Sequence, residues 1–195
     1  MKFSLTALFF LLTSAPAFAA GFTLSSPDIK EGGTIGNEHV FNSFSCTGKN
    51  ISPALNWSGA PAGTKSYAIT VYDPDAPTGS GWWHWVVFNI PAHAQGVAKN
   101  AGDVQTKLLP ADSIQSRTDY GKPGYGGPCP PVGNKPHRYE FTVHALKVDK
   151  LPLDADEAPV AGGLAGGPIN MVKAKTVDLL VPAEAEIVIE GMIDT

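Results

Sequence analysis

His137–Leu146 reads HRYEFTVHAL, and the alternation of its side chains decides the fold. Successive side chains of a β-strand point to opposite faces of the sheet. One face of this segment therefore carries His137, Tyr139, Phe141, Val143 and Ala145, and the other carries Arg138, Glu140, Thr142 and His144. The pattern predicts a strand with one buried face. It also turns His137 and Tyr139 towards the core where the strand begins.

Five further segments have strand character. They are Phe22–Ser25, Leu55–Ser58, Tyr67–Asp73, Trp82–Ile90 and Ala185–Ile189. Clusters of Gly and Pro that mark turns separate them, as in Pro77–Gly81 and Pro123–Pro128. Many short strands with turns favour an antiparallel sandwich over alternating βαβ units.

Helical signal is confined to the C-terminal third. Asp154–Ala165 has an acidic start, although neighbouring glycines weaken a helix there, and Pro168 is suited to open a second short helix through Ala174. No internal repeat is present. We therefore expect residues 20–195 to form a single domain with short helices towards the C-terminus.

The N-terminal residues have the organisation of an export signal. Lys2 gives a positive start, Phe3–Leu12 is mostly apolar, and Ala17 and Ala19 are small residues at the −3 and −1 positions of a cleavage site. The apolar run is too short to span a bilayer. We expect a signal peptide over residues 1–19, cleavage after Ala19, and a periplasmic or secreted protein.

The charge pattern limits the choice of partners. The net charge is −4, the charged fraction is 16%, and no basic block occurs. This argues against nucleic acid and anionic membrane surfaces as partners. We expect no integral membrane association and no cofactor.

The two cysteines are Cys46 and Cys129. In an oxidising compartment an even count favours a disulfide, which the chain-entropy model values at up to about 4–5 kcal/mol for so long a loop. Two buried thiols or one reactive thiol are the alternatives. Because no activating base is near either residue in sequence, we expect a structural disulfide.

Three ionisable residues fall at strand ends. Asp73 ends one strand, and His84 lies near the start of the next, on the face that regular alternation assigns to Trp82, Val86 and Phe88. If these strands pair antiparallel, Asp73 and His84 meet at one end of the sheet, and His137 can join them from a third strand. Buried ionisable groups are costly unless paired, so the cluster needs partners or a ligand.

These residues stand in blocks that resemble the signature motifs of the phosphatidylethanolamine-binding protein family. The blocks are DPDAP at Asp73–Pro77, GWWHW at Gly81–Trp85, Pro130-Pro131, and HRY at His137–Tyr139. Upstream, Asn50–Pro53 followed by Trp57 is similar to the bacterial Raf-kinase-inhibitor-like branch. The resemblance runs from about Phe22 to Leu146. The segment after Leu151 departs from it, with extra glycines.

The resemblance implies an antiparallel two-sheet Greek-key sandwich with a small pocket for phosphate or similar anionic head groups. It implies a binding protein, possessing no enzymatic activity, that modulates a protein partner. The pocket residues it assigns are Asp73, Trp82, His84, Pro131, His137 and Tyr139. In this interpretation the two histidines and Tyr139 donate to the anion, Asp73 orients an imidazole, and amides of Gly124–Gly127 add donors.

Other interpretations of the same residues stay open. A hydrolase would use Asp73, His84 and His137, but Ser80 lies in a Gly-Ser-Gly turn that does not resemble a nucleophile elbow. Two histidines and one carboxylate are also a ligand set for iron or zinc. Asp73 could instead cap the turn that contains Pro74.

Overall fold

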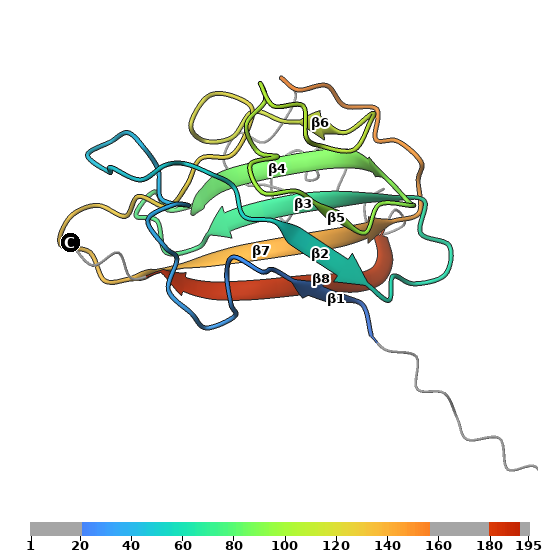
Figure 1. Ribbon diagram of the computed structural model, residues 1–195, viewed down its shortest axis with the longest axis horizontal. Helices are drawn as coiled ribbons and strands as arrows, with labels where there is room; N and C mark the ends of the chain where they lie inside the picture. The colour runs from blue at the N-terminus through green and yellow to red at the C-terminus, as the bar shows by residue number, and fades with distance from the viewer. Residues whose placement is uncertain (1–20, 157–179, 192–195) are drawn as a thin grey trace, which may run out of the picture.

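The structure, a computed structural model, describes residues 21–156 and 180–191, and these form two antiparallel sheets (Figure 1). The strands are β1 (Thr23–Ser25), β2 (Leu55–Ser58), β3 (Ser66–Asp73), β4 (Trp82–Pro91), β5 (Gly96–Val97), β6 (Ile114–Gln115), β7 (His137–Leu146) and β8 (Leu180–Gly191). The larger sheet has the order β6-β4-β3-β7-β8, and the smaller has the order β1-β2-β5. The predicted antiparallel two-sheet fold is confirmed.

The main core lies between the two sheets. In Figure 1 the small sheet lies in front of the large one. Leu55 and Trp57 of β2 share a buried cluster with Ile69 of β3, Trp85 of β4 and Phe141 of β7. The predicted alternation of β7 is confirmed, because Tyr139, Phe141, Val143 and Ala145 all belong to this cluster. A second cluster covers the opposite face of the large sheet and includes Ala68, Trp83, Val86, Phe88, Leu146 and Leu151.

Strand β4 departs from regular alternation at His84. Val71 of β3 pairs with Trp85 and Tyr72 pairs with Trp83, so His84 is an extra residue with no partner on β3. Such a bulge shifts the phase of the strand that contains it. The expectation that His84 shares a face with Val86 and Phe88 is therefore wrong. Those two residues lie in the second cluster, whereas His84 faces the pocket side with Trp82.

The strand predictions are confirmed at every long strand, with β2 and β7 at the expected bounds. The two-residue strands β5 and β6 were not predicted, because two residues carry no periodicity. Residues 154–156 are not helical, and the rest of the expected helical region lies outside the described residues.

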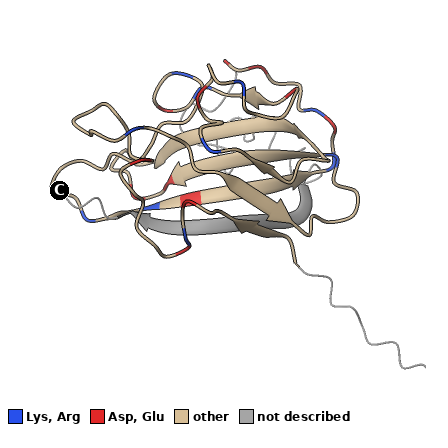
Figure 2. Ribbon diagram, viewed as in Figure 1, with Lys and Arg blue, Asp and Glu red and all other residues tan. Residues whose placement is uncertain are grey.

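In the coloured part of Figure 2, acidic and basic residues are interspersed along the loops, and few lie on β1–β7. Such a mixed distribution agrees with the absence of a basic block in the sequence. Within residues 21–156 and 180–191, no helix is long and apolar enough to cross a membrane.

Candidate functional site

A pocket of about 180 Å³ lies where β3 ends and where β4 and β7 begin. The antiparallel pairing of β3 with both neighbours brings these three strand ends together. Five of the six predicted pocket residues line it: Asp73, Trp82, His84, Pro131 and His137. The sixth, Tyr139, is fully buried behind the lining, with its ring centroid 5.1 Å from that of His84.

Asp73 is the hydrogen-bonding centre of the site. Its side chain is 4% exposed, and Oδ2 accepts a 2.7 Å hydrogen bond from His137 Nδ1. Its other oxygen, Oδ1, accepts from the backbone amide of Asp75 at 2.8 Å. The carboxylate thus both caps the turn after β3 and fixes one nitrogen of His137. The two roles that the sequence suggested for Asp73 coexist.

His84 is held in one orientation by the chain that follows β6. Its Nδ1 lies 2.7 Å from the carbonyl oxygen of Gly126, and its Nε2 lies 4.0 Å from Asp73 Oδ2. A carbonyl oxygen only accepts, so Nδ1 carries the hydrogen. Burial lowers the pKa of His84 to about 4, against the opposing effect of the hydrogen bond to Gly126. His84 is therefore neutral near pH 7, and an attraction of anions by a charged His84 does not apply there.

Tyr139 brings a polar group to the bottom of the site. Its hydroxyl is buried and has no hydrogen-bond partner among the described residues. Burial, and then the negative charge of Asp73, raise the pKa of this phenol, so the hydroxyl keeps its proton and can donate. The hydroxyl lies close enough to Asp73 for that side chain to contribute to the rise of its pKa.

Aromatic and proline side chains form the walls of the pocket. Tyr120 and Phe44 stack with ring centroids 5.7 Å apart, and Trp82 meets Tyr120 edge-on at 5.5 Å. Pro77, Pro130 and Pro131 also line the pocket. Sequence analysis missed Tyr120 and Phe44, because both come from irregular segments that only the tertiary fold brings to the strand ends.

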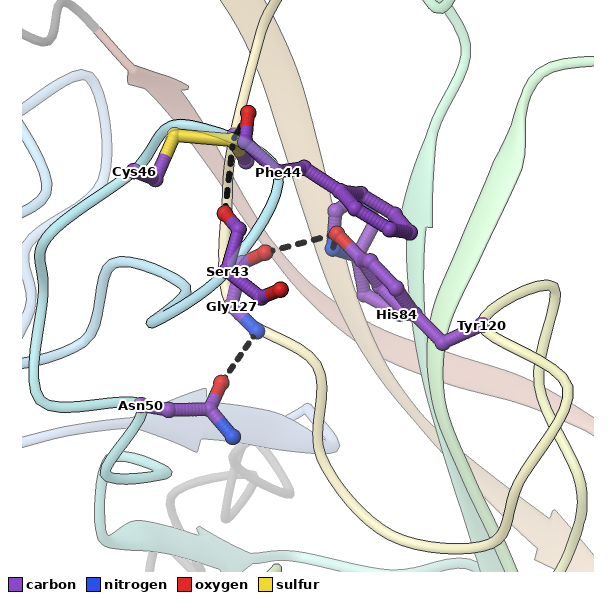
Figure 3. Close-up of a disulfide and its surroundings, with 8 residues drawn as sticks. Ser43, Phe44, Cys46, Asn50, His84, Tyr120 and Gly127 are labelled. Carbon is purple, nitrogen blue, oxygen red and sulfur yellow. Dashed lines mark hydrogen bonds between the residues drawn. A yellow bond between two sulfur atoms is a disulfide. The ribbon is translucent and has the colours of Figure 1, made fainter.

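The predicted disulfide between Cys46 and Cys129 is present in the structure. Figure 3 shows it next to Phe44, Tyr120 and His84. Cys129 lines the pocket, and the bridge ties the loop that carries Phe44 to the segment before Pro130. The hydroxyl of Tyr120 donates to the carbonyl of Gly127 at 2.8 Å, which anchors the facing wall.

The glycine-rich loop does not supply the expected amide donors. The amides of Tyr125, Gly126 and Gly127 donate to Gly102 O, His84 O and Asn50 Oδ1. The contribution of the loop lies in its carbonyls, which accept from His84 and Tyr120. For these three residues that part of the interpretation is wrong, because their amides hold the loop in place.

An ion pair borders the site next to His137. Arg138 and Asp75 form this ion pair, with Arg138 Nη2 2.7 Å from Asp75 Oδ1. The Arg138 guanidinium lowers the pKa of Asp75 to about 2.

Among the described residues, no group of three or more His, Cys, Asp or Glu side chains has a geometry suited to a metal ion.

The burial of His84 predicts a loss of stability in mild acid. Its pKa is about 4 in the folded chain and about 6.5 when unfolded, so the unfolded chain binds more protons between these values. The contribution to the free energy of unfolding is therefore full above pH 6.5 and lost as the pH falls to 4. It amounts to about 3 kcal/mol.

Urea unfolding of the wild type and of His84→Gln at several pH values between 4 and 7 measures this contribution. The variant should lack that part of the pH dependence. Identical slopes for the two proteins would show that His84 does not titrate as its burial requires.

The protein is thus a two-sheet β protein with a small pocket at the ends of its central strands, and the pocket has apolar walls and an ionisable floor. Residues 25–166 match the family model described as phosphatidylethanolamine-binding protein. The chain belongs to the phosphatidylethanolamine-binding protein family. Residues 140–195 also match a model described as 3-octaprenyl-4-hydroxybenzoate carboxy-lyase Rift-related domain. This second match covers less than a third of the chain, so it does not define the family.

Bacterial relatives agree with this assignment. The chain is 49% identical over 174 residues to the UPF0098 protein YbcL of Escherichia coli K12, covering 89% of this chain and 92% of YbcL. The crystal structure of YbcL, described as a member of the mammalian PEBP family, superposes with a TM-score of 0.79 at 46% identity, covering 90% of this chain and all of that one. A Mycobacterium tuberculosis protein named as a lipoprotein, LppC, is 37% identical over 78% of this chain and 69% of its own length.

Proposed function

We propose that this chain is an exported binding protein, without enzymatic activity, whose pocket holds a small anionic ligand such as a phosphate head group. The observation that carries the proposal is the buried group of Asp73, His84 and His137 at the pocket floor. Buried ionisable side chains are costly, and when they gather in a pocket they mark a candidate functional site. Membership of the family supports the same conclusion.

Each residue has a role in this proposal. Asp73 occupies Nδ1 of His137, so Nε2 is the nitrogen left for a ligand. Asn134 Nδ2, at 3.3 Å from that Nε2, is the neighbour that a ligand would displace or share. Tyr139 offers its buried hydroxyl as a donor. Trp82 and Pro131 act as apolar walls.

The hydrolase interpretation has less support. The hydroxyls of the lining residues belong to Thr78 and Tyr120, and they donate to the carbonyls of Gly81 and Gly127. Neither is therefore poised beside a base as a nucleophile must be. A metal-dependent activity would require Asp73 and His137 to exchange their mutual hydrogen bond for metal bonds. The binding interpretation requires neither a poised nucleophile nor the loss of the hydrogen bond between Asp73 and His137.

Export is the second element of the proposal. The signal-like residues 1–19, the disulfide between Cys46 and Cys129, and a relative named as a lipoprotein all favour an oxidising compartment outside the cytoplasm. We accordingly place the protein in the periplasm or the medium. Fractionation of cells that express the full chain, with the N-terminus of the product sequenced, tests the export and the cut after Ala19.

A protein partner is the third element of the proposal, and it rests on the family resemblance alone.

Replacing His137 with alanine is the direct test of the pocket. Loss of one charge-assisted hydrogen bond should weaken O-phosphorylethanolamine by roughly ten- to a hundredfold. NMR titration of the ligand measures this change. The matched control is His93→Ala, because His93 is exposed on a loop and does not line the pocket. Equal affinities of wild type and His137→Ala would remove His137 from the binding site.

A further inference from the structure

The floor of the pocket presents hydrogen-bond acceptors more readily than donors. The hydrogen of His84 is committed to the Gly126 carbonyl through Nδ1, so Nε2 of the neutral ring has a lone pair. Asp73 Oδ2 lies 4.0 Å away, and a carboxylate oxygen also accepts. Both side chains line the pocket, and both are at most 4% exposed. Two acceptors thus stand side by side with no hydrogen between them.

The other polar groups around His84 do not supply that hydrogen. His137 gives its Nδ1 hydrogen to Asp73, and Asn134 Nδ2, which can only donate, lies 3.3 Å from its Nε2. Tyr120 gives its hydroxyl hydrogen to Gly127. Tyr139 meets His84 edge-on, but it lies behind the pocket lining and its hydroxyl interacts with Asp73. These are the titratable groups that face His84: Asp73 from β3, His137 and Tyr139 from β7, and Tyr120 from the loop.

We propose that the pocket takes its oxyanion ligand with a proton still attached, so that a ligand O–H donates to His84 Nε2. The ligand class is then an acid that keeps a hydroxyl when bound, such as a phosphate monoester in its monoanionic form. A phosphodiester has no such hydrogen, and its oxygens would face the lone pairs of His84 and Asp73. The inference deepens the proposed function and rests on it. The low pKa of His84 supports it, because the ring stays neutral where monoesters lose their second proton.

The wild type alone provides the decisive comparison, with methyl phosphate as the monoester and dimethyl phosphate as the diester. At pH 5 both are monoanions, because the second pKa of a monoester is about 6. Calorimetry at pH 5 should find methyl phosphate at least about tenfold tighter, as expected for one charge-assisted hydrogen bond. Between pH 6 and 8 the affinity for methyl phosphate should fall by about tenfold per unit, with uptake of nearly one proton at pH 8.

Two glutamine variants assign the effect to one imidazole. In His84→Gln, the new amide can donate, so the preference for the monoester and its pH dependence should both disappear. In His137→Gln, both esters should bind more weakly while the preference and the pH dependence persist.

The outcomes separate this inference from the proposed function. Equal affinities for the two esters at pH 5, or an affinity for methyl phosphate that is constant from pH 6 to 8, overturns the inference and leaves anion binding standing. If neither ester binds at any pH, the proposed function fails and the inference fails with it. The comparison on the wild type stands even if His84→Gln does not fold.

Discussion

Replacing Phe141 with alanine is expected to lower the free energy of unfolding by about 3–5 kcal/mol. Phe141 is fully buried in the centre of β7, in the cluster between the two sheets. That cluster draws residues from both sheets, so it cannot close around the vacated volume without moving strands. Urea unfolding monitored by tryptophan fluorescence measures the change.

The matched control is the same substitution at Phe44, whose side chain is 66% exposed. Phe44→Ala should cost about 1 kcal/mol, since it loses its stacking on Tyr120 but leaves no cavity in the core. If the two variants were equally stable, the burial of β7 between the sheets would not be the main source of stability.

Comparison with His137→Ala separates scaffold from site on one strand. His137 and Phe141 lie on the same face of β7, but His137 stands at the strand end and lines the pocket. His137→Ala should weaken ligand binding while the protein stays folded. Phe141→Ala should instead lower the free energy of unfolding. Unfolding by His137→Ala as severe as that by Phe141→Ala would identify His137 as a structural residue.

The sequence predicted best where side-chain periodicity is long and regular. The first nine residues of β7 alternate without interruption, so its buried face followed from the sequence. Strand β4 alternates as well, but apolar residues occupy both of its faces. A one-residue bulge at His84 left no mark in such a pattern, and the faces of Val86 and Phe88 were therefore predicted one position out of phase. A second shift in register before Ile90 returns that residue to the inner cluster.

The sequence indicated the pocket-lining residues at strand ends but not those on loops, and the binding role of both stays a prediction. Asp73, His84 and His137 meet because antiparallel pairing forces three strand ends together. Tyr120 and Phe44 reach the pocket through loops whose paths depend on tertiary contacts, and no local pattern indicates them. The glycine-rich segment was misinterpreted for a related reason. Its composition suggested free amides, but those of Tyr125, Gly126 and Gly127 donate to Gly102, His84 and Asn50.

Removing the disulfide is expected to cost up to about 4–5 kcal/mol of stability. The bridge joins residues 83 positions apart, and in the chain-entropy model that figure follows from the loop it closes in the unfolded chain. The Cys46→Ser/Cys129→Ser double variant, compared with the oxidised wild type by urea unfolding, measures the loss. Reduction of the wild type should reproduce it. A double variant as stable as the wild type would contradict the prediction.

The same variant should also bind ligand less tightly, because the bridge holds the loop that carries Phe44. Phe44 is exposed and has the backbone φ of 56° that few side chains adopt, so its position over Tyr120 depends on the loop being held. Loss of one aromatic contact is worth about 0.5–1.5 kcal/mol, or roughly two- to tenfold in affinity. Phe44→Ala with the bridge intact should show the same loss of affinity with little loss of stability. If the double variant binds O-phosphorylethanolamine as tightly as the wild type, the bridge supports the fold alone and Phe44 finds its place without it.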